Sequence, residues 1–304
     1  MSTGDNFYEN GVKSVKDTQW NSSYEDVYVG KELRKLDWWS ILGNHDHLGD
    51  ISAQVDYGKR EGRWNLLNTS YKKVFNIGGE QVLFVFLDTT PFVKDGYGKE
   101  ARKKNKQDPG RQVEWFRKVM RDSREEKVVV VLHHNMYSIS IAGHFGTREV
   151  RAVIEPVLLE HRGRVLAVVS GHEHLLEHLQ PYGDKHSWSG FAGRFIENES
   201  LGMNVLERRK SRGKNKIRNG GVIDYFISGS GSQLDRLKTP SKHSESIWLD
   251  CCDILPFAKK INQPRAVFGE RIHGVFVFTI SKNKFIAKAV DENGKVVYTY
   301  EKDT

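Results

Sequence analysis

The chain has 304 residues, 38% of them apolar, so it can bury a sizeable core, and it is short enough to form one large α/β domain. Its formal net charge of +8 admits a nucleic-acid-binding protein, but residues 99–106 and 207–218 together carry +10, which leaves the rest slightly acidic. Neither run contains aromatic side chains for stacking on bases, so we expect basic surface insertions near residues 91–111 and 183–221 and no nucleic-acid partner.

Neither the cysteines nor the apolar runs define a cellular compartment. Cys251 and Cys252 are adjacent and imply no disulfide framework. No continuous apolar stretch reaches the roughly 18 residues of a membrane span. The start of the chain has no signal-peptide pattern. We therefore expect no transmembrane segment in this chain, and we expect a monomer.

The first third of the chain predicts helices and strands in alternation. Helical patterns cover residues 20–33 and 51–63, and an apolar run at residues 37–42 predicts a strand. Two further strands, at residues 71–77 and 81–87, are joined by Gly78-Gly79, which indicates a hairpin. Residues 91–111 follow as a long polar loop that contains the first basic run.

The middle of the chain predicts a βαβ arrangement. An amphipathic helix over residues 110–123 precedes a β-branched run at residues 127–132, which is typical of a fully buried strand. A second helix over residues 148–161 contains Pro156, which should kink or shorten it. Another buried strand follows at residues 165–169, so the pattern favours a parallel sheet covered by helices.

The last third of the chain changes character. Residues 183–221 are rich in glycine, serine and charge and predict a surface insertion. Strands are then expected at residues 222–227, 275–280, 285–290 and 296–300. Because no helical pattern separates the last three, we expect a second, antiparallel sheet and hence two packed sheets flanked by helices.

Four polar segments stand after apolar runs or at glycine turns. They are GDNFY at residues 4–8, GNHDH at 43–47, LHHN at 132–135 and GHEH at 171–174. Open α/β sheets place their chemistry at the carboxyl ends of strands, and imidazole with carboxylate is what first-row metals select. Together the segments predict a metal site. Either His133 or His134 could supply a ligand.

These four blocks resemble the signature blocks of the metallophosphoesterase (calcineurin-like) superfamily. Tyr8 and the flanking words SAQ at residues 52–54 and LDT at 87–89 narrow the resemblance to the tartrate-resistant purple acid phosphatases. The resemblance implies a four-layer αββα sandwich of two mixed β-sheets flanked by helices. It also implies a ferric iron beside a second divalent metal (Fe, Zn or Mn), hydrolysis of phosphate monoesters, and by analogy a secretory or lysosomal location.

The resemblance also assigns roles to individual residues. It implies that Asp5 bridges both metals, that Tyr8 and His174 bind the ferric ion, that Asn44, His133 and His172 bind the divalent metal, that His45 donates a proton to the leaving group, and that His144 contacts the substrate phosphate. His133 is favoured over His134 by alignment. We further expect Asp46 to orient His45, and His172 and His174 to point to one side because they lie two apart in an extended segment. The metals would polarise the phosphoryl group and generate a hydroxide nucleophile.

The sequence departs from the family pattern at its start. The family's first block, a Gly-Asp pair after an opening strand, supplies another ferric ligand and has no counterpart before residue 4, so we expect an N-terminally incomplete fold. The alternative is a catalytically impaired member that acts as a binding protein or as a membrane or cytoskeletal anchor. Lost ligands at Asn44, His45 or His174 would indicate that alternative, and all three are present.

Overall fold

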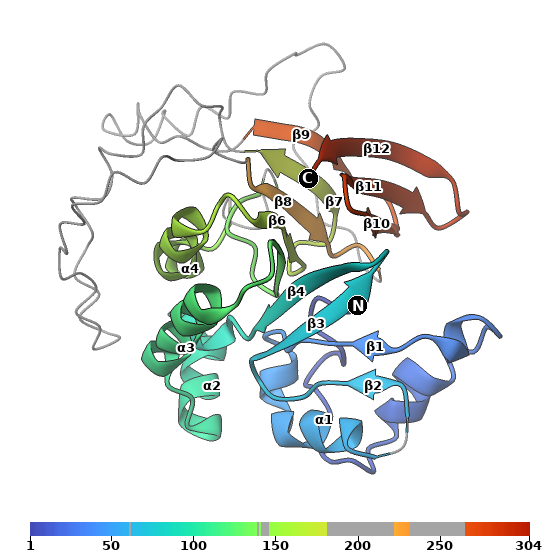
Figure 1. Cartoon of the computed structure of the whole chain (residues 1–304). Coiled ribbons are helices and arrows are strands. Elements are labelled where there is room, and N and C mark those ends of the chain that lie inside the picture. Colours follow the sequence, from blue (N-terminus) through green and yellow to red (C-terminus); the bar gives the residue numbers. More distant parts are fainter. Residues whose placement is uncertain (61, 139, 141–145, 181–221, 232–264) are drawn as a thin grey trace, which may run out of the picture.

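The computed structural model describes residues 1–60, 62–138, 140, 146–180, 222–231 and 265–304 (Figure 1). His144 and the expected insertion at residues 183–221 lie outside the described residues. Within the described part of the chain, no helix is both long and apolar enough to cross a membrane.

A seven-stranded mixed sheet forms the centre of the molecule. Its strand order is β3-β4-β5-β6-β8-β7-β9. The strands are β3 (Tyr71–Ile77), β4 (Glu80–Leu87), β5 (Lys127–Leu132), β6 (Val165–Ser170), β7 (Leu176–Gln180), β8 (Asp224–Ser228) and β9 (Arg265–Glu270). β4, β5, β6 and β8 run parallel, whereas β3 and β7 pair antiparallel with their neighbours. The expected hairpin and parallel βαβ arrangement are confirmed.

Both faces of this sheet are covered. Alternate residues of β4 and β5 belong to two separate apolar clusters: Phe84 and Val129 face one side, and Val85 and Val130 face the other. Helices α3 (Pro109–Asp122) and α4 (Arg148–Glu160) cover the second side. The first side packs against an antiparallel sheet of β10 (Gly274–Ile280), β11 (Lys284–Asp291) and β12 (Val296–Asp303), and against the N-terminal region (Figure 1). The two packed sheets with flanking helices match the expected metallophosphoesterase fold.

The N-terminal region is less regular than the sequence predicts. Instead of one α-helix over residues 20–33, the chain forms a short π-helix, η1 (Asn21–Glu25), and a short 3-10 helix, η2 (Leu33–Lys35). Asn, Ser and Tyr are mediocre helix formers, and burial of Trp20 and Tyr24 in the core determines the path of the chain. The strand expected at residues 37–42 shortens to β1 (Trp38–Trp39), which pairs with β2 (Trp64–Asn65).

Two helices in this half begin at aspartate caps, and one of them overturns a prediction. The Asp50 side chain accepts hydrogen bonds from the first turn of α1 (Ile51–Gly58), within the helix expected over residues 51–63. Residues 91–111 were expected to be a long loop, but they contain the turn η4 (Thr90–Phe92) and helix α2 (Gly96–Asn105), capped by Asp95. The Arg102 guanidinium ties α2 to the carbonyls of Pro91 and Val93, at 2.6 and 3.0 Å.

Other differences from the sequence predictions concern Pro156 and two strands. Helix α4 contains Pro156 and continues beyond it to Glu160, so the proline does not end the helix. β7 and β9 were not predicted; β7 carries buried Glu177 and His178, which hide its apolar pattern.

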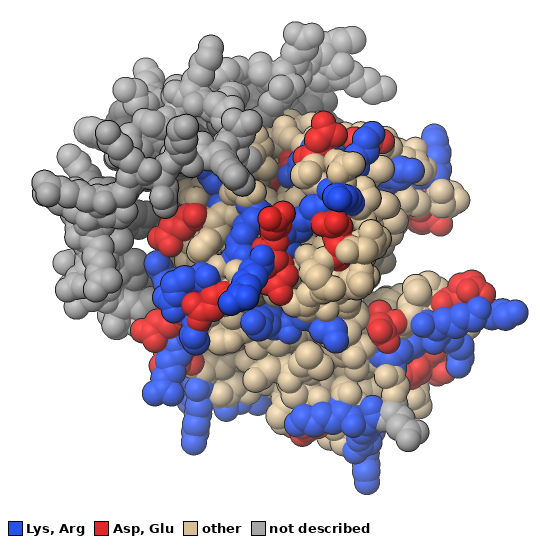
Figure 2. Space-filling view, viewed as in Figure 1, with Lys and Arg blue, Asp and Glu red and all other residues tan. Residues whose placement is uncertain are grey.

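On the face shown in Figure 2, lysines and arginines are interspersed with acidic side chains rather than gathered in one patch.

Candidate metal centre

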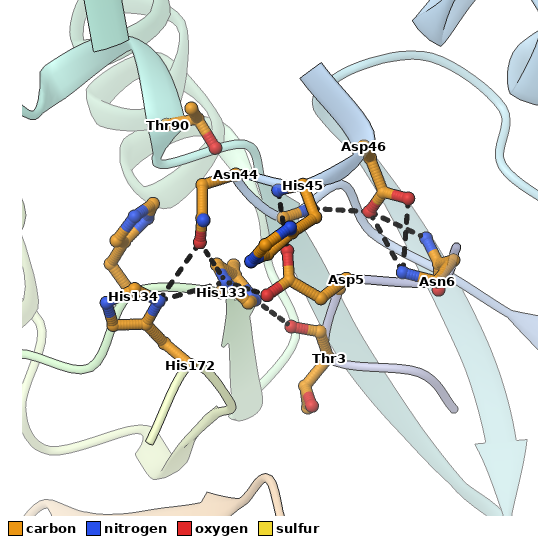
Figure 3. A network of polar contacts seen from close by, with 12 residues as sticks. Thr3, Asp5, Asn6, Asn44, His45, Asp46, Thr90, His133, His134 and His172 are labelled. Carbon is orange, nitrogen blue, oxygen red and sulfur yellow. Dashed lines mark hydrogen bonds and ion pairs between the residues drawn. The ribbon is translucent and has the colours of Figure 1, made fainter. Parts of the chain in front are cut away.

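Four chain segments meet at one edge of the large sheet. The segment around Asp5 lies beside β1, where Ser2 N–H donates to the Trp39 carbonyl at 2.8 Å. The turn that follows β6 is tied to the end of β5, because Gly171 N–H donates to the His133 carbonyl at 3.0 Å. Figure 3 shows the side chains of Asp5, Asn44, His133 and His172 pointing toward one another from these segments. Except for His144, every predicted site residue lies in this region.

Asn44, His133 and His172 bring their polar atoms together on one side of the site. Asn44 Oδ1 lies 2.9 Å from His133 Nε2 and 3.1 Å from His172 Nδ1, and the two nitrogens are 3.2 Å apart. His133 Nδ1 lies 2.8 Å from the Thr3 carbonyl, which can only accept, so Nδ1 carries the hydrogen. In the neutral ring, Nε2 is then an acceptor that faces another acceptor, the amide oxygen. This donor set fits a bound cation.

Asp5, Tyr8 and His174 form the other side of the site. Tyr8 O–H donates to Asp5 Oδ2 at 3.1 Å and lies 3.2 Å from His174 Nε2. The same carboxylate oxygen is 3.3 Å from His133 Nε2. Asp5 therefore stands between a phenol–imidazole pair and an amide–imidazole group.

The close packing of these groups shifts their pKa values. Burial raises the pKa of Asp5, but His133 outweighs it, and the net pKa lies below the ordinary carboxyl range. Burial opposes protonation of His133, yet the facing carboxylate raises its pKa, so the site attracts positive charge. Burial, aided by His133, lowers the pKa of His172 to about 3 and leaves a neutral ring. Burial and Asp5 raise the pKa of Tyr8, so its phenolate needs a neighbouring cation.

The backbone adopts unusual conformations at several of these residues. Asp5 and His172 have φ values of 54° and 70°, a region that costs non-glycine residues on the order of 1–3 kcal/mol and is concentrated at functional sites. Gly4 has φ 93°, and a Cβ there would come within 2.7 Å of His133 Nδ1. Because His172 takes this bent conformation, the segment through His174 is not extended, and the expected strand-like alternation is wrong.

Asp46 has a different role from the one expected. Its buried carboxylate accepts hydrogen bonds from Gly43 N–H at 2.8 Å, Gln54 Nε2 at 2.8 Å and Asn6 N–H at 3.1 Å. Burial, followed by the Asp5 charge, raises the pKa of Asp46 to about 6. Asp46 therefore fastens residues 4–8 to residues 43–47 rather than orienting His45.

The His45 ring is oriented by other groups. Its Nδ1 lies 2.6 Å from the Glu9 carbonyl, to which it donates. The ring contacts Tyr8 and Tyr97 of α2, with centroid separations of 4.6 and 5.5 Å. Its backbone N–H donates to Asp5 Oδ1 at 2.9 Å, which couples the histidine to the shared carboxylate.

Several supporting residues carried no role in the sequence analysis. Thr3 orients His133 through its carbonyl, and Asn6 with Gln54 holds Asp46. Thr89 contacts His134 through its hydroxyl. Gln54 and Thr89 lie in the two flanking words that carried the family resemblance, which was the available signal; a backbone carbonyl such as that of Thr3 leaves none.

Comparisons with known proteins find acid phosphatases among the proteins similar to this chain. The human tartrate-resistant acid phosphatase type 5 is 34% identical over 204 residues, which are 65% of this chain and 61% of that protein. Purple acid phosphatase 17 of Arabidopsis thaliana is 35% identical over 198 residues, 59% of this chain and 53% of that one. The chain thus spans about three fifths of the human relative's length.

The fold has a solved counterpart as well. A structure titled "GAP50 the anchor in the inner membrane complex of Plasmodium" matches with a TM-score of 0.65 and 20% identity, covering 99% of this chain and 76% of that one. Residues 1–176, which contain all of the described site residues, match the calcineurin-like phosphoesterase family. The chain belongs to that family, whose membership implies metal ions at this site.

Proposed function

We propose that the protein is a metal-dependent acid phosphatase that hydrolyses phosphate monoesters at a dinuclear centre of ferric iron and a divalent metal. The observation that carries the proposal is the meeting of acceptor atoms from four chain segments around Asp5. These acceptor atoms cannot all hydrogen-bond to one another. They are held together by strained backbone and by neighbouring groups whose own hydrogen bonds are complete. Two cations, one on each side of Asp5, satisfy that arrangement.

Each side of the site suits a different ion. Tyr8 and His174, with Asp5, would hold the ferric ion, because only a strongly Lewis-acidic ion keeps a buried phenol ionised at acid pH. Asn44, His133 and His172 would hold the divalent metal through neutral oxygen and nitrogen atoms. The bound metals would polarise the phosphoryl group and activate water.

His45 is suited to protonate the leaving alkoxide. Since Nδ1 donates to the Glu9 carbonyl, the imidazolium form has its remaining proton on Nε2, where it is available to a leaving oxygen. Packing against Tyr8 and Tyr97 limits rotation of the ring. His144 remains a proposed contact to the substrate phosphate.

The test compares wild-type protein with His172→Ala, using His161→Ala at the end of α4 as the control. We expect His172→Ala to lose most of the divalent metal and at least about 100-fold in turnover of an aryl phosphate, because even residues that only support ligands contribute 10- to 100-fold. The control should keep both. Equal metal content and turnover in His172→Ala would overturn the site assignment, and full metal loading without turnover in the wild type would favour the anchor alternative.

The ferric half has its own spectroscopic test. Tyr8→Phe should abolish the visible charge-transfer absorption expected of a ferric phenolate, because the phenylalanine ring has no oxygen to bind the iron. The divalent half does not contain Tyr8, so the divalent metal content should fall far less. A colourless wild type with full activity would show that a different metal pair is used.

A further inference from the structure

His134 has one ring nitrogen engaged and the other without a partner. It follows His133 at the end of β5 and is 2% exposed. Its Nδ1 lies 3.0 Å from Thr89 Oγ1, and the same hydroxyl oxygen accepts the His134 backbone N–H at 2.9 Å. Among the described residues, His134 Nε2 has no hydrogen-bond partner. Buried polar atoms normally have partners, so this nitrogen requires an explanation.

The unpartnered nitrogen belongs to a ring beside the divalent half of the site. The His134 ring centroid is 4.5 Å from that of His172 and 4.9 Å from that of His133. One ring nitrogen of each of the three histidines lies within 4.8 Å of the others. Figure 3 shows the His134 ring beside Asn44, on the same side as His172. Two nitrogens that share one zinc-like ion at about 2.1 Å can be up to about 4.2 Å apart, so a small ring rotation separates this cluster from a three-imidazole site.

We propose that His134 Nε2 is a further ligand of the divalent metal that Asn44, His133 and His172 hold. The inference rests on the proposed function, which places a metal there. The Thr89 hydroxyl can accept from Nδ1–H as well as from the backbone N–H, and this tautomer leaves the Nε2 lone pair free for a metal. Thr89 then orients the ring in the way that outer partners orient metal-binding histidines.

A third imidazole also narrows the identity of the ion. Imidazole suits zinc, ferrous iron and copper, whereas manganese prefers carboxylate, carbonyl and water oxygens. Three nitrogens beside the Asn44 amide oxygen and the shared Asp5 carboxylate therefore favour zinc or ferrous iron over manganese in this half of the site. The preference should weaken when the His134 nitrogen is removed.

Two substitutions separate the nitrogens of His134. His134→Asn keeps a polar atom near the Nδ1 position, and with it the Thr89 contact, but has no atom at Nε2. His134→Gln places its amide near Nε2 and gives up the Thr89 contact. Each iron-loaded protein is titrated with Zn²⁺ and with Mn²⁺ against a chromophoric chelator, and thermal unfolding of the metal-free proteins checks the fold.

We expect His134→Asn to bind Zn²⁺ about 10- to 100-fold more weakly than the wild type, with a smaller Zn²⁺ to Mn²⁺ preference, and His134→Gln to retain more of the zinc affinity. Wild-type zinc affinity in His134→Asn, with loss confined to His134→Gln, would show that the histidine serves only Thr89 and would overturn the inference. His172→Ala shows whether such a result also affects the proposed divalent site. If His172→Ala lowers the zinc affinity while His134→Asn does not, only the inference about His134 fails. A wild type that binds no zinc overturns the inference together with the proposed divalent site.

Discussion

Among the described residues, two of the buried clusters that contain histidine and aspartate are built in opposite ways. In the first, His178 Nε2 donates to Asp224 Oδ1 at 2.8 Å, and the Tyr298 hydroxyl lies 2.8 Å from the other ring nitrogen. Lys302 pairs with the second oxygen of Asp224. Every acceptor there faces a donor. In the second, His133 Nε2 lies 2.9 Å from Asn44 Oδ1 and 3.3 Å from Asp5 Oδ2, so that in the neutral ring one acceptor faces two other acceptors.

The difference shows that burial and residue type do not by themselves identify a functional site. His47 is an example near the site. Its ring is fully buried, with Nε2 2.8 Å from Asp88 Oδ2 and Nδ1 3.2 Å from the Asn105 amide nitrogen, so both ring nitrogens have partners. What marks the metal centre is a surplus of acceptors that the protein itself cannot satisfy. The saturated clusters should therefore support stability, and the unsaturated one should support binding.

The largest effect on metal binding is expected from Asp5→Asn. The variant loses the charge that the two proposed cations would share, so we expect both metals to be lost and turnover to fall by at least about 1000-fold, since metal ions contribute several kcal/mol to such reactions. The metal-free variant should unfold at nearly the wild-type urea concentration, because asparagine has the same shape as aspartate and keeps one side-chain oxygen that can accept a hydrogen bond. Metal analysis, aryl phosphate turnover and urea unfolding measure the three quantities. Full metal loading in Asp5→Asn would contradict the shared-carboxylate role.

Asp224→Ala should behave in the opposite way. It leaves Lys302 and His178 without their buried partner, which lowers the free energy of unfolding by about 3 kcal/mol or more. Metal content per folded molecule should stay at the wild-type level. Urea unfolding of the metal-free proteins gives the first quantity and metal analysis of the soluble fraction gives the second. A variant as stable as the wild type would mean that saturation of this cluster contributes nothing to stability.

The two clusters also differ in how far the sequence predicted them. Asp5, Asn44 and His172 were predictable because short motifs with fixed neighbours carried a family resemblance, and the same holds for the β-branched run of β5. The saturated pair of His178 and Asp224 was not, because its members are 46 residues apart and their pairing has no local pattern. His178 and the neighbouring Glu177, both buried on β7, also hide the apolar pattern of that strand.

Local pattern was also insufficient where tertiary packing determines the backbone. Residues 20–33 have helical spacing, but Trp20 stacks on Tyr57 with ring centroids 3.6 Å apart, and that contact lies outside any local window. Helix α2 was read as a loop because its side chains are polar, whereas its stability comes from the Asp95 cap and from carbonyls that it reaches in η4. The motif predicted His45 as a site residue, but its orienting partner, the Glu9 carbonyl, is a backbone group that sequence does not reveal.

A pH series tests whether the Asp224 cluster stabilises the fold. Burial works against ionisation of Asp224, but the His178 and Lys302 partners outweigh it and lower its pKa below the ordinary 3.8. A carboxyl group whose pKa is lower in the folded state stabilises the fold above its ordinary pKa, and this contribution disappears as the pH falls through the folded value. Between about pH 5 and about pH 2.5, urea midpoints should therefore fall less steeply for Asp224→Asn than for the wild type. Parallel slopes would contradict this assignment.

The smallest expected effect concerns α2, which borders the unsaturated site without contributing a ligand. Lys104 Nζ donates to the carbonyls of Leu48 and Gly49, at 2.9 and 2.6 Å, and Tyr97 lies against His45. Lys104→Ala removes these bonds at an exposed position, so we expect about 1 kcal/mol less resistance to local opening and about fivefold faster trypsin cleavage within α2. Because cleavage frees the side of His45 that Tyr97 covers, turnover should rise as the helix is cut. Lys118→Ala, which removes an exposed ion pair with Asp122 on α3, is the matched control and should leave both rates unchanged. Equal cleavage of the two variants would show that Lys104 does not hold the helix, and cleavage without a gain in turnover would show that α2 does not restrict the site.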